Sequence, residues 1–263
     1  MNCVKPKKKF GQHFLKDKSI AEKVATIIPV EFEGKILEIG PGTGVLTQFL
    51  MNTRLKDLYL SEIDTESIEY LKENLIDATY HHRIIEGDFL KNASSMLKDA
   101  NWFVIGNFPY NISSQILFKI LENRQFVDGF GGMFQREVAR RICSEPHSKE
   151  YGILSVLVQA YFQMEYCFTV SENVFNPPPK VKTGVIKGWR YRETLGDCSD
   201  KLFFDVVKTA FNQRRKTMNN CLKKFNLPTE TLEQTGFAKL RPENLSVQDF
   251  IKITQVIETQ NQR

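Results

Sequence analysis

Apolar and polar residues follow two different patterns along this chain, and the pattern changes near residue 200. Before that point, short apolar runs recur between segments with helical spacing, which predicts β-strands alternating with α-helices. Strands are predicted at residues 35–39, 58–63, 83–86, 102–106, 131–134, 164–170 and 181–189, and helices at 19–28, 45–51, 65–75, 113–121 and 136–143. The segment 151–163 is apolar enough for a helix or a strand, and we favour a helix that leads into a strand.

Strands that alternate with helices form a mostly parallel sheet covered on both faces, so the predicted fold class is α/β, Rossmann-like and doubly wound. Beyond a turn-rich segment at 196–200, only helices are predicted, at residues 202–211, 215–225, 229–236 and 246–260. We therefore expect a basic arm at 1–18, a Rossmann-like domain at 19–195 and a small helical domain at 196–263.

Composition excludes several classes of protein. The 263 residues are 41% hydrophobic and 25% charged, which is ordinary for a globular protein. No apolar run is long enough to span a membrane, and the basic start lacks the apolar core of a secretory signal, so we expect a cytoplasmic protein. The five cysteines are scattered without a CxxC pair, which predicts reduced thiols and no metal site.

The net charge of +5 is unevenly distributed along the chain. Residues 1–18 carry +5 and residues 180–263 carry +7, whereas the segment between them carries −7. An acidic body with two basic ends predicts surfaces for a polyanion, although a solubilising lysine tail explains the charge equally well.

A glycine-rich motif leaves the strand predicted at 35–39. It reads Glu38-Ile39-Gly40-Pro41-Gly42-Thr43-Gly44, and a helix follows it. Glycines let a backbone approach a ligand closely, but a purely structural turn is the alternative. The spacing is GxGxG, whereas a dinucleotide site has GxGxxG, and Pro41 removes an N–H donor. A ligand without a pyrophosphate suits this loop.

Acidic residues at two later strand ends add to a nucleoside site. Glu62 ends the second predicted strand, where a carboxylate accepts hydrogen bonds from a ribose diol. Asp64 is the competing candidate, but it lies further from the strand end. Asp88 follows the third strand and can accept from an adenine amino group. This set is similar to that of the methyltransferases that use S-adenosylmethionine.

The sequence Asn107-Phe108-Pro109-Tyr110 follows the fourth strand, at the same edge of the sheet. The structural alternative is a helix cap, a turn proline and a core aromatic residue. An (Asn/Asp)-x-Pro-(Tyr/Phe) turn is similar to that of the enzymes that methylate exocyclic amines in nucleic acids. The side-chain oxygen of Asn107 and a backbone carbonyl near Phe108 can accept both N6–H bonds of adenine. These acceptors free the nitrogen lone pair and stabilise developing positive charge, while Tyr110 stacks on the base.

With these motifs the sequence resembles the small-subunit ribosomal RNA adenine N6,N6-dimethyltransferases, the KsgA family. Further segments that carry the resemblance are residues 9–15, 135–140, 151–159, 175–181, 211–222 and 241–246, so it covers nearly the whole chain. The resemblance implies dimethylation of two adjacent adenosines in a hairpin loop near the 3′ end of 16S rRNA. It also implies S-adenosylmethionine as methyl donor, S-adenosylhomocysteine as product, no metal and a role in small-subunit biogenesis. Since no heptad seam is visible, we expect a monomer.

The resemblance also implies roles for single residues. The implied cofactor contacts are His13, Leu15, Gly40, Gly42, Glu62, Asp88 and Asn107. The implied catalytic residues are Asn107, Pro109, Tyr110 and Phe175, with Phe175 as a second stacking face for the base. The candidate RNA contacts are Lys7, Lys8, Lys9, Arg214, Arg215, Lys216, Lys223 and Lys224. Two positions depart from the pattern, because Phe108 stands where Leu is common and Thr183 where Ser is common.

Three other functions remain open. A related enzyme methylates 23S rRNA and confers macrolide resistance, but the helical segments at 211–246 favour the small-subunit family. An assembly factor could have kept the fold without the activity, although the complete cofactor and amine motifs argue against this. A nicotinamide-dependent dehydrogenase is the most distant alternative, because the phosphate-binding spacing is absent.

Overall fold

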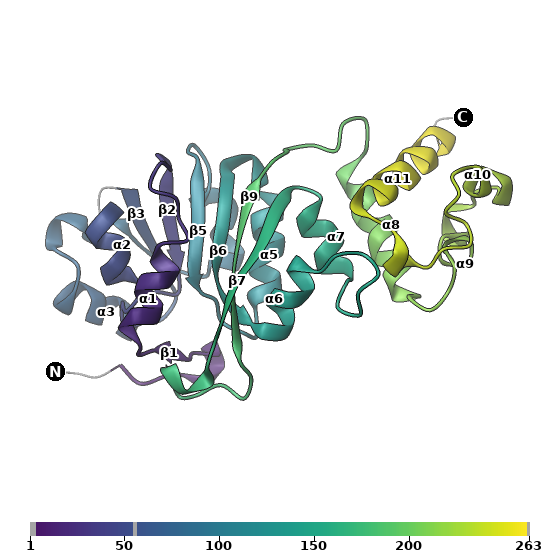
Figure 1. Ribbon diagram of the computed structural model, residues 1–263. Coiled ribbons are helices and arrows are strands. Elements are labelled where there is room, and N and C mark those ends of the chain that lie inside the picture. Colours follow the sequence, from purple (N-terminus) through teal and green to yellow (C-terminus); the bar gives the residue numbers. More distant parts are fainter. Residues whose placement is uncertain (1–3, 55–56, 262–263) are drawn as a thin grey trace. The chain divides into compact units, whose positions relative to one another are not determined.

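The computed structural model describes residues 4–54 and 57–261, so Cys3, one of the predicted free thiols, lies outside the described residues. A sheet of seven strands holds the order β4-β3-β2-β5-β6-β9-β7 (Figure 1). The strands are β2 (Lys35–Ile39), β3 (Leu58–Glu62), β4 (Ile84–Glu86), β5 (Trp102–Asn107), β6 (Val127–Gln135), β7 (Phe162–Val170) and β9 (Thr183–Arg190). Pairs from β4 through β6 are parallel, whereas β6 and β9 are antiparallel.

The strand order reverses between β2 and β5. Along the chain the first strands add toward β4, and the later strands add on the other side of β2. Such a switch leaves a crevice outside the carboxyl ends of the strands, because the flanking connections leave in opposite directions. The fold therefore positions a ligand site where the glycine-rich loop and the Asn107 turn begin, as the sequence predicts.

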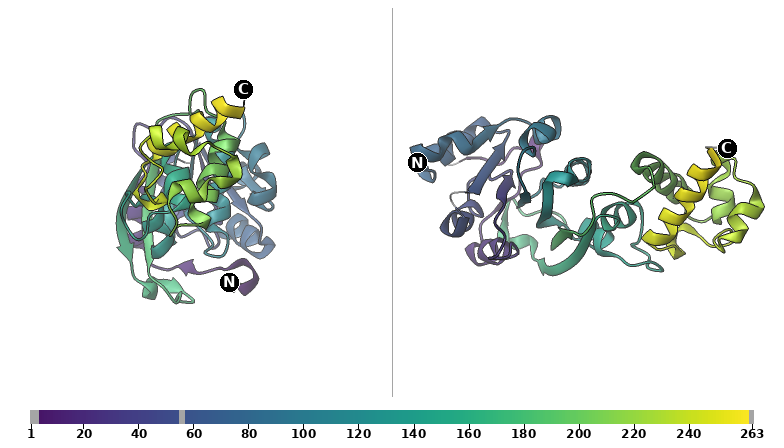
Figure 2. Two further views of the ribbon diagram at one scale, coloured as in Figure 1. Left: turned by 90° about the vertical axis from the view of Figure 1, so that its right-hand side faces the viewer. Right: turned by 90° about the horizontal axis from the view of Figure 1, so that it is seen from above.

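Helices cover both faces of this sheet (Figure 2). One face carries α1 (Lys18–Ala25), α2 (Thr47–Arg54) and α3 (Thr65–Asn74), and α4 (Phe89–Met96) packs with α5 (Ser113–Glu122). The core on the first face joins buried side chains of all three helices to alternate strand residues, including Val24, Leu50, Leu71, Ile36 and Phe103. Alternation in the strands and helical spacing in the helices direct these side chains to the same interior.

A two-stranded antiparallel sheet attaches the N-terminal segment to a later loop. Its strands are β1 (Phe14–Leu15) and β8 (Phe175–Asn176), with Leu15 opposite Phe175. Short 3₁₀ turns precede both strands, at Lys8–Phe10 and Glu172–Val174. The described part of the basic arm is therefore bound to the body of the protein by strand pairing.

The chain forms two compact units. Unit 1 runs to Ala139 and resumes over Glu165–Arg190, and unit 2 consists of Arg140–Met164 and the chain from Tyr191 onward. The helix α6 (Arg136–Cys143) crosses between them in the sequence. Unit 2 contains α7 (Ile153–Gln159), α8 (Asp200–Asn212), α9 (Met218–Cys221), α10 (Thr229–Gln234) and α11 (Val247–Asn261).

The boundary of unit 2 differs from the expected one at 196, because residues 140–164 join the C-terminal helices. The reason is an aromatic core: the ring of Tyr151 lies 6.0 Å from that of Phe211, and Phe211 stacks on Phe250 at 5.7 Å. Such a core links segments distant in sequence, and composition near residue 196 does not reveal it.

Several local expectations also change. The helix α1 is capped by Asp17, whose carboxylate accepts from the backbone N–H groups of Ser19 and Ile20 at 2.9 and 3.2 Å, so Ser19 is not the cap. The helix α4 was not predicted from the sequence. The helix expected at 215–225 is the single turn α9 followed by a 3₁₀ turn at Lys223–Phe225. Further 3₁₀ turns of the described residues lie at Ala78–Arg83, Arg124–Phe126 and Pro242–Asn244.

Candidate active site

A cavity of about 240 Å³ opens in unit 1 at the carboxyl ends of β2, β3, β4 and β5. Eight of the residues that the sequence predicts as cofactor contacts or catalytic residues line its wall: His13, Gly40, Gly42, Glu62, Asp88, Asn107, Pro109 and Tyr110. The fold thus brings together residues that are up to 97 positions apart, from His13 to Tyr110.

The glycine-rich loop forms the wall that follows β2. A Cβ built on Gly40 would meet no atom within 4 Å, so the backbone there borders open space. Gly42 has φ +56°, and a Cβ on it would lie 2.8 Å from the ring of Phe14. A side chain at position 42 would therefore be strained and would push the N-terminal arm away from the loop.

Glu62 has its carboxylate fixed by backbone hydrogen bonds. One oxygen accepts from the N–H of Gly42 at 3.1 Å, and the other accepts from Ile63 and Asp64, both at 2.9 Å. Burial raises the pKa of Glu62, while the three backbone N–H groups oppose this shift because they stabilise the carboxylate. These bonds fix the rotamer of Glu62, so its carboxylate is oriented before a ligand binds.

Asp88 serves as the N-cap of α4, since its Oδ1 accepts from the N–H of Leu90 at 2.9 Å. This bond uses one carboxylate oxygen, and Asp88 lines the cavity wall. The apolar residues Ile63, Phe89 and Leu90 surround this end of the cavity.

Ile63 is a site residue that the sequence reasoning missed. Its side chain is 44% exposed although it is a large apolar residue, and it lines the cavity beside Glu62. Its place directly after the acid that ends β3 is the signal that could have revealed it. An exposed aliphatic surface at that point suits the face of a nucleobase.

Asn107 ends β5, and its amide is oriented by the arm. The Nδ2 group donates to the carbonyl oxygen of His13 at 2.7 Å, which leaves the amide oxygen as an acceptor. The imidazole of His13 in turn donates from Nδ1 to the carbonyl of Pro177 at 2.7 Å. Two segments remote in sequence therefore determine how the Asn107 amide is presented.

Tyr110 lines the same cavity, and its hydroxyl is hydrogen-bonded to that of the buried Thr183 on β9. Burial raises the pKa of Tyr110, so the phenol is neutral at physiological pH. The ring lies 5.5 Å from that of His13 at an interplanar angle of 31°. The departure at position 183 thus keeps the hydroxyl group that holds Tyr110.

Phe108, the other departure, is fully buried, and its ring packs on Phe134 at 4.7 Å. Its backbone N–H donates to the carbonyl of Met133 at 3.1 Å, which connects the turn to β6. The larger side chain is therefore accommodated in the core of unit 1.

Two predicted residues lie outside the cavity wall. Phe175 is fully buried within the hydrophobic core, and its neighbour across the sheet, Leu15, is buried in the same cluster. A completely buried ring offers no face to a base, so the expectation that Phe175 stacks on the substrate is corrected. Its alternation with the exposed Asn176 on β8 directs its side chain inward.

The candidate RNA contacts divide into two groups. Lys7 pairs with Asp64 at 2.5 Å, Arg214 with Glu243 at 2.5 Å and Lys224 with Asp205 at 2.8 Å. Arg214 also donates to the carbonyl of Ser148 at 3.2 Å. The partly buried pairs of Lys7 and Arg214 make these two cations poorer phosphate contacts than the sequence indicates. The Lys224 pair is about half exposed on both sides and restrains its lysine less.

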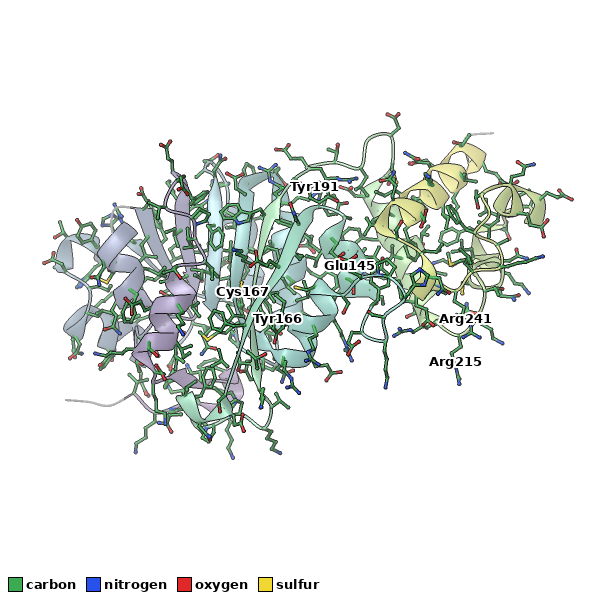
Figure 3. The ribbon with its side chains drawn as sticks, in the orientation of Figure 1. Glu145, Tyr166, Cys167, Tyr191, Arg215 and Arg241 are labelled. Carbon is green, nitrogen blue, oxygen red and sulfur yellow. The ribbon has the colours of Figure 1, made fainter. Side chains whose placement is uncertain are left out.

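The other candidates are exposed: Lys8, Lys9, Arg215, Lys216 and Lys223. In unit 2, backbone hydrogen bonds from Met218 to Leu240 and from Asn219 to Ala238 place the segment after Lys216 beside the segment before Arg241. Figure 3 shows the side chains of Arg215 and Arg241 on the same side of this unit. Arg241, also exposed, was not among the predicted RNA contacts.

Over residues 4–54 and 57–261, no group of three or more His, Cys, Asp or Glu side chains could hold a metal ion. In the same part of the chain, no helix is both long and apolar enough to cross a bilayer.

The sheet order and the loops at its switch point define a Rossmann-like methyltransferase that uses S-adenosylmethionine. Residues 4–259 match the family model described as "Ribosomal RNA adenine dimethylase". The "Ribosomal RNA small subunit methyltransferase A" of Flavobacterium johnsoniae is 53% identical over 259 residues, covering 98% of each chain. This chain therefore belongs to the ribosomal RNA adenine dimethylase family, whose members dimethylate adenine in ribosomal RNA.

Two solved structures share the fold at low sequence identity. The dimethyladenosine transferase from Plasmodium falciparum has a TM-score of 0.79 at 24% identity, covering 95% of this chain and 98% of its own. The 23S rRNA methyltransferase ErmE has a TM-score of 0.65 at 24% identity, covering 92% of this chain and 99% of its own. At this identity the likeness supports the architecture alone.

The cavity fits S-adenosylmethionine. Glu62 is an oriented acceptor suited to a ribose diol, Asp88 lies beside an apolar wall suited to a purine, and the loop at Gly40 leaves room for a close-lying ligand backbone. The GxGxG spacing of the loop, with Pro41 in place of an N–H donor, differs from that of a pyrophosphate site.

Proposed function

We propose that this protein dimethylates N6 of two adjacent adenosines in a hairpin loop near the 3′ end of 16S rRNA, within a precursor of the small ribosomal subunit. The observation that carries the proposal is the orientation of Asn107, whose nitrogen is bonded to His13 so that its oxygen remains available to an amine. The full-length similarity to a relative named for the small subunit supports the choice of RNA.

For the cofactor, Glu62 accepts from the ribose hydroxyls and Asp88 from the adenine amino group. Ile63 covers one face of the adenine, and the backbone around Gly40 and Gly42 contacts the amino-acid portion. When bound, the cofactor would supply an electrophilic methyl group attached to a sulfonium sulfur. On transfer of the methyl group the C–S bond breaks, and the sulfur becomes a neutral thioether. Because these contacts come from strand ends and from the glycine-rich loop that follows β2, the cofactor is held in one position for in-line transfer.

For the amine, the oxygen of Asn107 and a backbone carbonyl near Phe108 accept the two N6–H bonds of adenine. These bonds localise the lone pair on nitrogen, which otherwise is delocalised into the ring. The nitrogen pair then forms the new N–C bond, and the proton on the resulting ammonium leaves to solvent. The two acceptor dipoles stabilise the positive charge that develops on the nitrogen. Because the resulting ammonium loses its proton to solvent, no separate general base is required.

Tyr110 stacks on the target adenine, and its hydrogen bond to Thr183 keeps the ring at a constant angle. Pro109 stiffens the turn between Asn107 and Tyr110, because its ring limits the backbone. Base stacking on an aromatic ring is the usual way in which an unpaired nucleotide is held.

For the RNA backbone, the exposed cations Lys8, Lys9, Arg215, Lys216 and Lys223 contact phosphates, together with Arg241. We propose that the enzyme acts as a monomer in the cytoplasm, where precursor subunits are assembled, and that it contributes to their biogenesis.

Labelled methyl transfer from S-adenosylmethionine to undermethylated small subunits tests this function. Large subunits are assayed in parallel, and nuclease digestion with mass spectrometry identifies the modified nucleoside. We expect N6,N6-dimethyladenosine only in the RNA of the small subunit. Label in 23S rRNA would instead indicate an enzyme of the macrolide-resistance type. Binding of cofactor and subunit without transfer would indicate an assembly factor.

A further inference from the structure

The N-terminal arm, defined here as residues 4–17, forms one wall of the cofactor cavity through residues 9–14. Two glycines allow it to lie directly on the site. A Cβ on Gly42 would be 2.8 Å from the ring of Phe14, and a Cβ on Gly11 (φ +62°) would be 2.3 Å from the side-chain oxygen of Asn111. The arm thus contacts both the glycine-rich loop and the segment that follows Tyr110.

Asp64 connects this arm to the opposite wall. It lies two residues after Glu62, at the N-cap position of α3, but its carboxylate caps no backbone N–H there. The carboxylate instead accepts from Lys7 Nζ at 2.5 Å and from Gln12 Nε2 at 3.3 Å, with a further bond from the hydroxyl of Ser67 at 3.3 Å. Aspartate at this position usually accepts a hydrogen bond from the first turn of its helix, but here the carboxylate binds side chains of the arm.

Lys7, Gln12 and Asp64 form a closed set, because the backbone N–H of Lys7 donates to the side-chain oxygen of Gln12 at 2.8 Å. The Asp64 side chain is 3% exposed and that of Lys7 is 26% exposed. Glu66 adds a second carboxylate 3.2 Å from Lys7 Nζ. The cation is therefore shared by two acids, one of which is almost inaccessible to water.

Both partners stay charged at neutral pH. Burial works against ionisation of Asp64, but its hydrogen bonds to Lys7 and Gln12 outweigh burial and hold its pKa below the usual range. The hydrogen bond to Asp64 raises the pKa of Lys7, although desolvation opposes it. Removing the lysine would leave a buried carboxylate without its cation, which is strongly unfavourable.

We propose that the Lys7–Asp64 ion pair is a latch that holds the arm closed over the cofactor cavity, so that both are positioning residues for cofactor binding. The inference rests on the proposed cofactor site in unit 1. Because the carbonyl of His13 on the same arm accepts from Asn107, closing the latch also orients the amide that faces the amine. Occupation of the cofactor cavity and readiness of the amine site are thereby coupled.

Calorimetric titration of the full chain with S-adenosylhomocysteine tests the latch without any RNA. For Lys7→Met we expect an affinity about tenfold weaker than that of the wild type. Lys16→Met is the matched control, since Lys16 is an exposed cation of the same arm that does not line the cavity. Its affinity should remain within about twofold. The double variant Lys7→Met/Asp64→Asn should recover part of the loss, because no buried charge is left unpaired.

Hydrogen exchange of the backbone amides at residues 8–14 is the second measurement. In the unliganded protein these amides should exchange faster in Lys7→Met than in Lys16→Met, because the arm opens more often. Equal affinity and equal exchange in the two variants would overturn the latch. If the wild type fails to bind S-adenosylhomocysteine, the cofactor assignment fails, and the exchange comparison still decides whether Lys7 holds the arm.

Discussion

The cavity of unit 1 and the exposed cations of the protein differ in how their side chains are held. Around the cavity, each polar group that we assign to a ligand is also bonded within the protein: Glu62 to three backbone N–H groups, Asp88 to Leu90 and Asn107 to His13. By contrast, Arg215 and Lys216 of unit 2 are exposed, and among the described residues no ion pair restrains them.

This difference teaches what each region can do. Groups that are oriented in advance around a cavity can act on single atoms, because folding has already fixed their geometry. Exposed cations on flexible side chains attract a polyanion over several ångströms, in a way that salt weakens. Changes in the first region should therefore alter the rate of methyl transfer at every salt concentration. Changes in the second region should weaken RNA binding most at low salt and less as the salt concentration rises.

The largest effect is expected at Asn107. Asn107→Ala removes the acceptor for the N6–H bond and also the bond to His13, so we expect methyl transfer at saturating cofactor to fall roughly 10³-fold. Single-turnover assays on small subunits at low and high salt measure this loss, which should be independent of salt. The circular dichroism spectrum should stay that of the wild type. Turnover near the wild-type rate would contradict the assigned role.

Asn107→Asp is the companion variant. It keeps an acceptor toward the amine but sets a carboxylate against the carbonyl of His13, where the wild type has a donor. If transfer depends on how the arm orients this side chain, the aspartate should be nearly as inactive as the alanine. Activity near that of the wild type would mean that methyl transfer requires only an acceptor oxygen at position 107, whatever its orientation by the arm.

The next effect is expected at Glu62. Glu62→Gln keeps the shape of the side chain, but only one of its two ends can still accept, so one of the bonds to the backbone and the contact to ribose are lost. A hydrogen bond to a charged group contributes about 1.5–3 kcal/mol, so we expect cofactor affinity to fall roughly ten- to hundredfold. Calorimetry with S-adenosylhomocysteine measures the change, and Asp57, which does not line this cavity, provides the control Asp57→Asn.

These sites also indicate why the sequence predicts one region better than the other. The strand at Lys35–Ile39 has the predicted bounds, and β3 differs from its prediction by one residue. A short apolar run that ends in a glycine or an acid is compatible with only one kind of element, a buried strand. The carboxyl ends of parallel strands meet at one edge, so placing Glu38, Glu62 and Asn107 along the chain also places them in space. The helix α4 was not predicted, because the polar residues of its segment Asn92–Ser95 interrupt the apolar pattern of the face that it buries.

The remaining errors concern partners that no local pattern specifies. Lys7 and Arg214 are basic residues in basic segments, yet both are neutralised by acids distant in sequence, Asp64 and Glu243. Phe175 follows the same logic, since a loop aromatic becomes a core residue through its pairing with Leu15. Charge and aromatic character can be read from the sequence, but tertiary contacts decide whether they serve the interior or a ligand.

A smaller effect is expected from the cations of unit 2. The double reversal Arg215→Glu/Lys216→Glu should weaken binding to small subunits about tenfold at low salt. It should also reduce the steepness of the fall of log affinity with log salt by about two. The control is Lys201→Glu/Lys252→Glu, which makes the same change of charge at two other exposed lysines of unit 2. Equal effects of the two doubles would mean that only net charge matters.

Arg214 should behave differently from its neighbours. It holds Glu243 at 2.5 Å and the carbonyl of Ser148 at 3.2 Å, so reversing its charge would set two carboxylates together. We therefore expect Arg214→Glu to lower the stability of unit 2 as well as RNA affinity, whereas Arg215→Glu should leave thermal unfolding nearly unchanged. Thermal scans of both variants separate the two cases.

The last effect concerns stability alone, is confined to the interior and is expected at Glu38. This carboxyl is buried on β2, with one oxygen lacking a hydrogen-bond partner among the described residues, and burial raises its pKa to about 8. Between its ordinary pKa of 4.5 and about 8, the unfolded chain has lost this proton and the folded protein retains it. The free energy of unfolding must therefore fall as pH rises through that interval, by up to about 1.4 kcal/mol per pH unit.

Glu38→Gln has no such proton to lose, so its stability should exceed that of the wild type increasingly from pH 5 to pH 8. Urea unfolding followed by tryptophan fluorescence reports on unit 1 alone, because both tryptophans, Trp102 and Trp189, lie there. Glu62, whose pKa is also raised by burial, is present in both proteins, so its own burial is common to the comparison. Its negative charge is one of the causes that raise the pKa of Glu38, so it adds to the expected difference. Because the group is buried, the difference should also persist in high salt, unlike the effect of reversing Arg215 and Lys216. Parallel pH curves for the two proteins would mean that Glu38 is ionised in the folded state. The contrast between an interior that salt does not affect and a surface that salt screens would then not extend to this residue.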